Sequence, residues 1–351
     1  RMYRHLIRPL LFLLSPETIH HLLISFLRVA FKIPGVFPLV KSCYHIKNKS
    51  LETDFLGMHF SNPVGLAAGF DKNASVYREF YAFGFSFIEV GTVTPLGQPG
   101  NEKPRSFRIK KDRGLINRMG FNNHGAEAAA ARLGHKRPKG LILGGNIGKN
   151  TLTPNERAVD DYEAVFNAIY DGVHYFVVNV SCPNISDLRK LQDQDSLEQI
   201  LGRIMVLREK RDVKKPVLLK ISPDLNDTQL DETLEIVERL KIDGIVATNT
   251  TVSREGLHTS EDDIQAIGKG GMSGAPITAR SLEVVRYVHQ KSEGKLPIIA
   301  VGGIMSVEDA LNMLEAGATL IQIYTGFIYE GPGLVKRINR AILKRRTASQ
   351  S

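Results

Sequence analysis

The sequence predicts an α/β fold, a (β/α)8 TIM barrel preceded by a small N-terminal helical extension. Three observations predict it. From residue 64 onward, eight short segments rich in Val, Ile and Phe recur, each followed by a glycine- or asparagine-rich corner and then by a segment of helical spacing. The segments are continuously apolar, as in a parallel sheet buried on both faces. Eight such units in about 280 residues favour a closed barrel over an open doubly wound sheet.

The eight expected strands share this apolar character, and they are Val64–Phe70, Phe85–Thr94, Leu141–Ile147, Tyr175–Val180, Val217–Ser222, Gly244–Thr250, Pro297–Gly302 and Thr319–Tyr324. Between them lie amphipathic segments such as Asp224–Leu240, whose leucines, isoleucine and valine fall on one helical face. The stretch Pro95–Asn123 is too long and too polar for an ordinary connection after a barrel strand. Long insertions of this kind are usually functional lids, so we expect one here.

The composition of the 351-residue chain is that of an ordinary globular protein, with 42% hydrophobic and 24% charged residues. A net charge of +9 is compatible with several kinds of anionic partner. The absence of tryptophan, and of arginines interleaved with aromatic residues, argues against nucleic-acid binding. The two cysteines, Cys43 and Cys182, cannot build a disulfide framework, which indicates an intracellular, reduced protein.

The first 40 residues are dense in apolar side chains but are interrupted by charged residues and prolines, so no uncharged stretch reaches the ~18–20 residues of a membrane span. No small-residue cleavage site of a signal peptide follows. Ser15-Pro16-Glu17 provides an N-cap, a proline in the first helical turn and an early acid, which predicts two short helices meeting at residue 15. These helices either lie at a membrane interface or pack on the barrel.

The corners at the carboxyl ends of the strands form the expected active site, because chemistry in this architecture takes place there. Their residues are amides, hydroxyls, glycines and two lysines, and they include Gly69, Asp71, Lys72, Gly91, Thr92, Asn146, Asn179, Cys182, Lys220, Thr248, Asn249, Thr250, Gly302, Gly303, Tyr324, Thr325 and Gly326. Paired carboxylates and metal-ligand spacings are missing, which argues against glycosidase chemistry and against a metal site. Amide side chains suit a planar heterocycle with carbonyl and N–H edges, such as a flavin or a pyrimidine.

Individual corners leave alternatives open. Gly302-Gly303 and Thr325-Gly326 follow the last two strands, where barrels commonly bind phosphate, although such glycines also serve simply as corners. Lys220 could form a Schiff base, as in an aldolase-type lyase, or could remain charged beside an anionic cofactor. Cys182, in a polar loop past a strand end, is placed for acid–base or nucleophilic work rather than for packing. A non-catalytic membrane-associated scaffold is disfavoured, since so many polar groups converge on one barrel mouth.

Seven motifs in order make the chain similar to one family. They are Gly65-Leu66-Ala67-Ala68-Gly69-Phe70-Asp71-Lys72, Glu89-Val90-Gly91-Thr92-Val93-Thr94-Pro95, Gln98-Pro99-Gly100-Asn101, Leu115-Ile116-Asn117-Arg118-Met119-Gly120-Phe121-Asn122-Asn123, Asn146-Ile147-Gly148-Lys149-Asn150, Ala247-Thr248-Asn249-Thr250-Thr251 and Val301-Gly302-Gly303-Ile304. With these motifs, the whole chain resembles the class 2, quinone-linked dihydroorotate dehydrogenases of pyrimidine biosynthesis.

The resemblance implies a division of the chain and a reaction. Residues 1–45 would be a two-helix segment that associates with the membrane and gives the quinone access, residues 46–346 a barrel with one FMN, and residues 347–351 a polar tail. The enzyme would oxidise (S)-dihydroorotate to orotate in UMP biosynthesis, with FMN as hydride acceptor and a membrane quinone as final acceptor. It would be peripheral, on the cytoplasmic face of the cell membrane, which favours the interfacial interpretation of the helices.

The resemblance also implies site residues. The FMN contacts would be Ala68, Gly69, Phe70, Asp71, Lys72, Thr92, Asn146, Asn179, Lys220, Thr248, Gly274, Gly303, Tyr324 and Thr325. The contacts to dihydroorotate or orotate would be Lys72, Asn117, Arg118, Met119, Gly120, Phe121, Asn179, Asn184, Asn249 and Thr250. Amides would bind the pyrimidine, Lys72 would offset its carboxylate, and Lys220 would stabilise negative charge on the reduced flavin. The loop from Ser186 to Asp195 would act as a lid.

Residue 182 would be the base that takes a proton from C5 of dihydroorotate while a hydride leaves C6 for flavin N5. Here the chain departs from the family pattern, because class 2 enzymes usually carry serine at this position and the soluble class 1 enzymes carry cysteine. A thiol ionises more readily than a serine hydroxyl, so we expect a class 1-like pH profile. Because of this cysteine, fumarate or NAD is an alternative final electron acceptor. The N-terminal extension and the string from Asn117 to Asn123 favour quinone.

Overall fold

A closed barrel of eight parallel strands forms the centre of the computed structural model, which describes residues 3–183 and 188–349. The order around the barrel is β10-β11-β12-β14-β15-β3-β4-β9. The strands are β3 (Val64–Leu66), β4 (Phe87–Val93), β9 (Ile142–Ile147), β10 (Tyr175–Asn179), β11 (Val217–Ile221), β12 (Gly244–Ala247), β14 (Ile298–Val301) and β15 (Leu320–Ile323). Each lies within its predicted range, so the predicted TIM barrel is confirmed.

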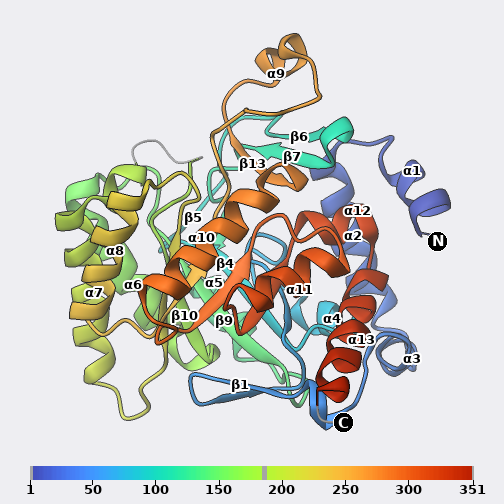
Figure 1. Ribbon diagram of the computed structural model, residues 1–351, viewed down its shortest axis with the longest axis horizontal. Helices are drawn as coiled ribbons and strands as arrows, with labels where there is room; N and C mark the ends of the chain where they lie inside the picture. The colour runs from blue at the N-terminus through green and yellow to red at the C-terminus, as the bar shows by residue number, and fades with distance from the viewer. Residues whose placement is uncertain (1–2, 184–187, 350–351) are drawn as a thin grey trace.

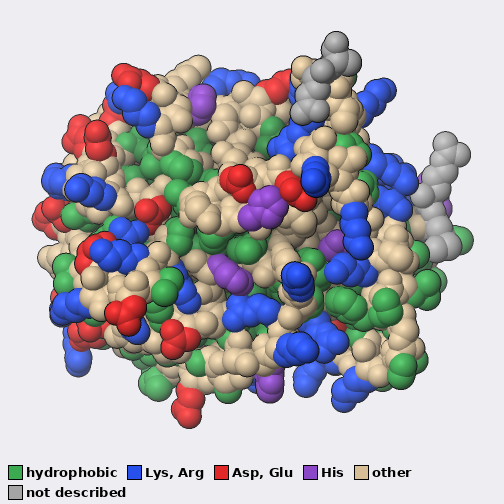
Figure 2. Space-filling view, turned by 90° about the horizontal axis from the view of Figure 1, so that it is seen from below, with side chains coloured by type: hydrophobic (Ala, Val, Ile, Leu, Met, Phe, Trp, Pro, Cys, Tyr) green, Lys and Arg blue, Asp and Glu red, His purple; other side chains and the backbone are tan. Residues whose placement is uncertain are grey.

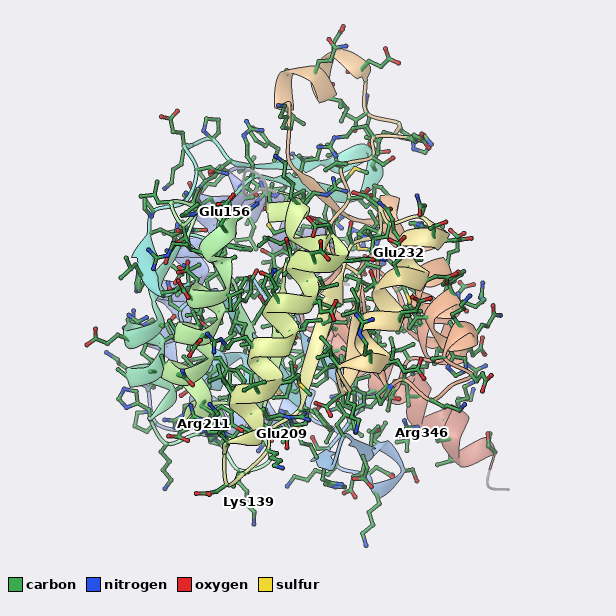
Figure 3. All side chains as sticks on the ribbon, turned by 90° about the vertical axis from the view of Figure 1, so that its left-hand side faces the viewer. Lys139, Glu156, Glu209, Arg211, Glu232 and Arg346 are labelled. Atoms are coloured by element: carbon green, nitrogen blue, oxygen red, sulfur yellow. The ribbon has the colours of Figure 1, made fainter. Side chains whose placement is uncertain are left out.

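A ring of helices surrounds the barrel and covers the outer face of its strands (Figure 1). The helices are α4 (Tyr77–Tyr81), α5 (Ala126–Leu133), α6 (Ala158–Ile169), α7 (Gln194–Glu209), α8 (Asp227–Arg239), α10 (Thr278–Lys291), α11 (Val307–Glu315), α12 (Thr325–Glu330) and α13 (Gly333–Ala348). Helix α8 begins with a capping box between Asn226 and Gln229 and buries an apolar face, as its spacing predicted. Charged side chains such as Glu209 and Glu232 lie on the outer surface of the ring (Figure 3).

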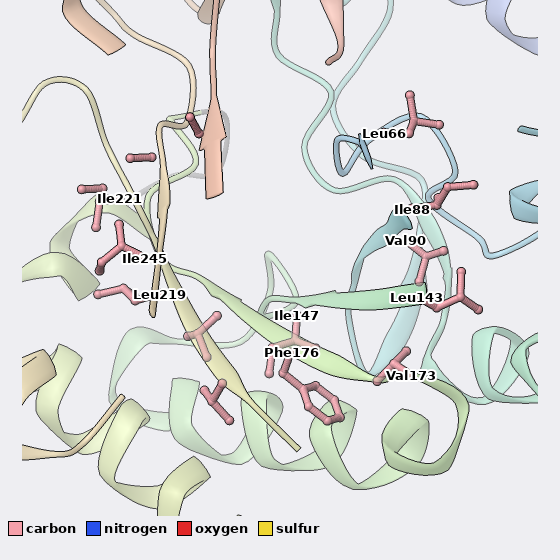
Figure 4. Packing of buried hydrophobic residues seen from close by; sticks show 14 of the residues in the cluster. Leu66, Ile88, Val90, Leu143, Ile147, Val173, Phe176, Leu219, Ile221 and Ile245 are labelled. Atoms are coloured by element: carbon pink, nitrogen blue, oxygen red, sulfur yellow. The ribbon is translucent and has the colours of Figure 1, made fainter. Parts of the chain in front are cut away.

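The apolar core has two layers. The outer layer lies between strands and helices, and Figure 4 shows members of it such as Leu143, Phe176 and Leu219. The inner layer fills the barrel, as expected for a packed interior rather than a pore. A hairpin of β1 (Thr53–Phe55) and β2 (Met58–Phe60) closes the amino-terminal end of the barrel, where Phe60 packs edge-to-face on Phe87. The hairpin therefore leaves the opposite end of the barrel for a cavity.

Two excursions from the barrel pair with each other over its carboxyl-terminal end. In the first, β5 (Leu96–Gln98) pairs with β8 (Asn123–Gly125), and β6 (Ser106–Ile109) pairs with β7 (Gly114–Asn117). The second adds β13 (Gly271–Gly274) to β7 as a third antiparallel strand, and its helix α9 (Glu261–Ile267) projects beyond the sheet (Figure 1). The insertion Pro95–Asn123 thus lies over the barrel mouth. The pairing with β13 was not predicted.

The N-terminal segment lies beside α12 and α13 (Figure 1). It contains η1 (Tyr3–Ile7, a π-helix), α1 (Arg8–Leu11), α2 (Pro16–Ala30) and α3 (Val36–Tyr44). Ser15 caps α2 by accepting a hydrogen bond from the Thr18 amide at 3.2 Å, which confirms the predicted break at residue 15. Helix α3 was not predicted. The remaining short helices are of the 3₁₀ type: η2 (Lys49–Leu51), η3 (Lys110–Asp112), η4 (Asn155–Arg157), η5 (Tyr170–Gly172), η6 (Leu188–Gln192) and η7 (Ala275–Ile277).

The surface of this segment is apolar and basic. Leu10, Leu13, Phe26 and Val29 are each more than 60% exposed. Lys and Arg side chains gather beside hydrophobic ones on the right-hand side of the molecule seen from below (Figure 2). Among the described residues, no single helix has the length and apolar character to cross a bilayer; only the pair Tyr3–Leu11 and Pro16–Ala30, bent by 110°, meets both criteria together.

Candidate active site at the barrel mouth

A polar cavity lies at the carboxyl ends of the barrel strands, beneath the two excursions. Most of the residues expected at the site line it: Ala68, Gly69, Lys72, Thr92, Asn117, Met119, Gly120, Phe121, Asn179, Cys182, Lys220, Thr248, Asn249, Thr250, Gly274, Gly303, Tyr324 and Thr325. They come from the ends of the barrel strands and, through Asn117 and Gly274, from the paired strands β7 and β13. The structure therefore brings together residues that lie more than 250 positions apart in the sequence.

Four expected contact residues are not among those that line this cavity. The Asp71 carboxylate is buried and accepts hydrogen bonds from the amides of Ser75 and Val76 at 2.7 and 2.9 Å, so it holds the loop after β3. The Arg118 guanidinium donates to backbone carbonyls of the second excursion. The remaining two are Phe70, which lines a neighbouring cavity, and Asn146, which is completely buried. Asn184, and part of the expected lid, lie outside the described residues.

The amides at the mouth contact one another. Asn179 Nδ2 donates to Thr92 Oγ1 at 3.2 Å, and Asn249 Nδ2 donates to Asn179 Oδ1 at 3.1 Å. Each amide is therefore held in one orientation by a protein partner. Such an array presents fixed donors and acceptors to a planar ring, which is what recognition of a heterocycle requires.

Two lysines flank the thiol of Cys182, which is only 8% exposed. Burial lowers the pKa of Lys220, whereas the negative charges of Glu89 and Cys182 oppose this shift. Burial also lowers the pKa of Lys72 to about 8; Arg105 adds to this shift, and Cys182 opposes it. Since the attraction is mutual, the positive charge of both lysines stabilises a thiolate at position 182. Lys72 Nζ also donates to Asn122 Oδ1 at 2.6 Å, which holds this lysine at the rim.

The glycines at the mouth leave room for a bound phosphate group. Gly303 has a φ of +75°, and a Cβ there would lie 2.4 Å from Thr278. Gly274 has a φ of +97°, and a Cβ there would lie 2.5 Å from the carbonyl oxygen of Arg113. Among the described contacts, the backbone N–H groups of Gly303 and Thr325 donate to no other protein group. A narrow, glycine-lined cradle with unused N–H groups fits the phosphate of a flavin mononucleotide.

A second cavity, of about 550 Å³, lies between the barrel and the N-terminal helices and is lined largely by apolar side chains of α2 and of the corner after β3. It shares Gly69, Lys72 and Tyr324 with the first cavity, so the two adjoin. The His20 ring lies here, 5.9 Å from the ring of Phe70. Burial, with the charge of Lys72, lowers the pKa of His20 to about 4, so this imidazole is neutral at pH 7.

Two buried polar residues of this region were not found from the sequence. Gln322 on β15 lines the polar cavity, and Glu89 on β4 lies completely buried among barrel strands. The sequence did contain a signal for them: a charged residue and an amide residue occur inside strands whose other residues are apolar on both faces. Such residues are costly to bury without partners, and they therefore mark a buried polar network.

Comparisons with known proteins identify the family. A family model described as dihydroorotate dehydrogenase matches residues 50–345. A protein of Christiangramia forsetii named dihydroorotate dehydrogenase (quinone) is 54% identical over 344 residues, which cover 98% of this chain and 99% of that protein. A protein of the same name from Chloroflexus aurantiacus is 45% identical over 356 residues, covering 99% of this chain and 98% of that protein.

Solved structures give the same result. The crystal structure of ligand-free DHODH from Eimeria tenella has a TM-score of 0.86 and 34% identity, covering 95% of this chain and 96% of that one. The structure of that organism's DHODH in complex with ferulenol has a TM-score of 0.84 and 32% identity, with coverage of 96% and 93%. Because the likeness extends over the helical extension, the barrel and the excursions, this chain belongs to the dihydroorotate dehydrogenase family, in its class 2, quinone-dependent branch.

Proposed function

We propose that this enzyme oxidises dihydroorotate to orotate at the barrel mouth, with FMN as hydride acceptor and a membrane quinone as final electron acceptor, in pyrimidine biosynthesis. The observation that carries the proposal is the junction of two unlike cavities. A polar cavity suited to a charged heterocycle adjoins an apolar cavity under the N-terminal helices, and Gly69, Lys72 and Tyr324 border both. A cofactor at this junction would meet a polar substrate on one side and a hydrophobic acceptor on the other.

One FMN per chain is the cofactor we propose for this flavin-dependent family. Its phosphate would be held at Gly303 and Thr325, and its ring by Thr92, Asn179 and Lys220. When bound, FMN supplies a two-electron acceptor for a hydride and passes the electrons to the quinone. The lysine ammonium, buried and close to Glu89, would offset negative charge at the ring edge.

The substrate would lie against the amides of Asn117, Asn179 and Asn249, with its carboxylate near Lys72. The amides match the alternating carbonyl and N–H groups of a pyrimidine, and a cation in a partly buried site suits a carboxylate. A cysteine base is typical of class 1 enzymes and so raised fumarate or NAD as alternative acceptors. The relatives named dihydroorotate dehydrogenase (quinone) do not favour this alternative. A lyase that uses Lys220 as a Schiff-base residue is likewise not favoured by membership of an oxidoreductase family.

Cys182 is the base in this proposal. Its thiolate takes the proton from C5 of dihydroorotate while a hydride leaves C6, and the C5–C6 double bond of orotate forms from the electron pair left at C5. The proton then resides on the sulfur and must return to solvent before the next turnover. Two nearby lysines support the ionised thiol, whose reference pKa of about 8.5 is already far below that of serine.

Peripheral association with the cytoplasmic face of the cell membrane would deliver the quinone. The exposed apolar side chains of α1 and α2 would enter the lipid interface, with the exposed Arg28 and Lys32 at the headgroups. The apolar cavity behind these helices would then open toward the lipid. This arrangement explains why a chain with an enclosed polar site also exposes so many large apolar residues on one segment.

The test is dihydroorotate oxidation by the purified flavoprotein with a ubiquinone or menaquinone analogue, compared with fumarate and NAD. We expect turnover with the quinone analogue, an absorbance spectrum of bound flavin, and one FMN per chain after extraction. A flavin that dihydroorotate fails to reduce would refute the proposal. Reduction followed by preferential transfer to fumarate or NAD would refute only the proposed acceptor.

A further inference from the structure

A carboxylate that the proposed reaction does not use lies inside the barrel, below the polar cavity. Glu89 on β4 is completely buried. Its negative charge acts on Lys220, but within the described part of the chain no lysine or arginine forms an ion pair with it. Instead it accepts hydrogen bonds from three side chains on other strands: Asn146 Nδ2 at 2.8 Å, Gln322 Nε2 at 2.6 Å and the Tyr175 hydroxyl at 3.4 Å. A buried carboxylate is costly without such donors, so the network around it is specific.

Asn146 connects this carboxylate, by hydrogen bonds, to the wall of the polar cavity. Because the carboxylate accepts, Asn146 turns its NH₂ toward Glu89 and its Oδ1 away. The Thr92 hydroxyl donates its only proton to that Oδ1, at 2.6 Å. Thr92 Oγ1 is then left as an acceptor, and it receives Asn179 Nδ2 at 3.2 Å.

These bonds form a hydrogen-bond relay from Glu89 through Asn146 and Thr92 to Asn179. The relay continues to the other side of the barrel mouth. Asn179 Oδ1 accepts from Asn249 Nδ2 at 3.1 Å, and Asn249 Oδ1 accepts from the backbone N–H of Thr250 at 3.0 Å. The second N–H of Asn249 donates to Ser181 Oγ at 2.9 Å. Asn179 Oδ1 also accepts from the backbone N–H of Ser181 at 3.4 Å. The relay therefore runs from two fixed donors, the Thr250 and Ser181 amides, to a fixed acceptor, Glu89, and every donor in it points toward Glu89.

This direction determines what the wall offers a ligand. Among the described contacts, one N–H of Asn179 and one lone pair of Asn249 remain uncommitted, so the first is a donor and the second an acceptor. A reversed Asn146 would donate to Thr92 and free the threonine proton, which would change the hydrogen-bonding character of the wall. A site that distinguishes the carbonyl and N–H groups of a ring depends on these assignments.

We infer that Glu89 is a positioning residue: through Asn146 it fixes the direction of the Thr92 hydroxyl, which accepts from Asn179 at the wall that faces the pyrimidine ring. The inference rests on the proposed function, because it takes the substrate to be a pyrimidine at this wall. It also assigns Asn146 a role through Thr92. The resemblance to the family had implied for Asn146 only a contact with the cofactor.

The test reverses one bond of the relay without changing side-chain volume. In the Glu89→Gln variant, the glutamine can donate to Asn146 Oδ1, so the orientation of Asn146 is no longer fixed and the Thr92 hydroxyl can lose its acceptor. We expect the affinity for orotate, titrated by the change in flavin absorbance, to fall about tenfold or more, and KM for dihydroorotate to rise more than kcat falls. In the double variant Glu89→Gln/Asn146→Asp, the glutamine donates to the aspartate, which still accepts from Thr92. We expect this variant to bind orotate within about threefold of the parent.

The rescue separates the relay from other roles. If Asn146 acted only by its own contact with FMN, its replacement by aspartate would not rescue Glu89→Gln. Tyr175→Phe is the matched control, since it removes a donor to the same carboxylate that lies outside the relay, and we expect orotate affinity within about twofold of the parent. A double variant that folds and keeps its flavin but binds orotate no better than Glu89→Gln would overturn the inference.

Two further readouts keep the result decisive. If the Glu89→Gln protein does not fold, Thr92→Val and Thr92→Ser replace it. The relay requires the hydroxyl, so serine should retain orotate binding and valine should lose it. Equal affinity of the two would overturn the inference. A parent enzyme whose flavin neither responds to orotate nor is reduced by dihydroorotate would refute the proposed function itself, whereas unaltered relay variants of an active parent refute only the role of Glu89.

Discussion

Glu17 and Arg105, which are 88 positions apart, form a buried ion pair between the N-terminal helix α2 and the first excursion. Arg105 Nη2 donates to Glu17 Oε1 at 2.6 Å, and Nε donates to the same oxygen at 3.1 Å. The Nη1 atom of Arg105 donates to the carbonyl of Asn101, whose own amide donates to the carbonyl of Met119. The pair therefore connects the helix at the apolar cavity with the segment that lines the polar one.

Glu17→Gln should destabilise the protein at neutral pH and reduce its sensitivity to acid. Burial by itself would raise the pKa of Glu17, but the hydrogen bonds and charge of Arg105, aided by Lys103, lower it to about 2. A depressed carboxylate pKa contributes stability above about pH 4.5 that is lost as the pH falls toward 2. We expect a loss of about 3 kcal/mol at pH 7, measured by denaturant unfolding.

The same measurement at pH 3 is the control for this prediction. There the carboxylate contributes less in the parent, so the difference in unfolding free energy between parent and Glu17→Gln should shrink. A difference that is constant from pH 7 to pH 3 would mean that the substitution acts by packing and that the ion pair adds nothing.

His20→Ala should impair the reaction with quinone and spare the reaction with dihydroorotate. The imidazole is neutral at pH 7 because burial lowers its pKa to about 4, and it forms part of the wall of the apolar cavity. We expect KM for a quinone analogue to rise about tenfold, the equivalent of ~1.4 kcal/mol of lost contact. Anaerobic reduction of the flavin by dihydroorotate should proceed at the parent rate. Slower reduction would place His20 in the first half-reaction instead.

The barrel could be predicted because a strand buried on both faces is a short apolar run, and eight such runs with polar corners permit few other folds. Strand β13 could not, because it is a glycine-rich segment whose partner β7 lies about 150 residues earlier, and no local pattern encodes that pairing. Gly274 was expected from family resemblance alone. The neighbouring Ser273, which lines the polar cavity, was not predicted, because no local pattern places β13 over the cavity.

Within the site, residue type indicated that a residue was polar and near the mouth, but not the direction of its side chain. Asp71 and Arg118 occur in the same motifs as cavity residues, yet their side chains form hydrogen bonds within loops and do not line the cavity. In an irregular corner, the alternation of side chains along a strand no longer determines which way a side chain points. Asn146, at the end of a regular strand, points to Glu89 inside the barrel. Its direction depends on a partner 57 positions away in the sequence.

Lys220→Ala should slow flavin reduction by dihydroorotate at least about a hundredfold. The ammonium is the cation that would face the negative charge gained by the cofactor, and Glu89 and Cys182 both favour its charged form. The reduction potential of the bound flavin should also fall, which a structural defect would not require. Stopped-flow absorbance and spectroelectrochemistry measure the two effects. Lys214→Ala, which changes an exposed lysine before the same strand, is the control and should match the parent.

Leu10→Asp together with Leu13→Asp should release the protein from lipid vesicles. Both side chains are largely exposed, at 68% and 79%, so the changes remove apolar surface without opening the core. We expect sedimentation with anionic vesicles to drop to the level of a vesicle-free sample, while flavin reduction is unchanged. Leu152→Asp, at a side chain 96% exposed on the barrel, should sediment like the parent. Equal losses in both proteins would indicate a general charge effect and not docking by the N-terminal segment.

Cys182→Ser should remain active but shift its pH optimum upward. The base must be ionised to accept the C5 proton, and a serine hydroxyl ionises at far higher pH than a thiol, whose reference pKa is about 8.5. The rate of flavin reduction in the serine variant should therefore still be rising at a pH at which the parent has reached its plateau. Cys182→Ala, which has no ionisable group at this position, should reduce its flavin at least about a hundredfold more slowly at every pH. A serine variant with the parent's pH profile would show that another group titrates, and Lys72, with its pKa of about 8, would then be the first to examine.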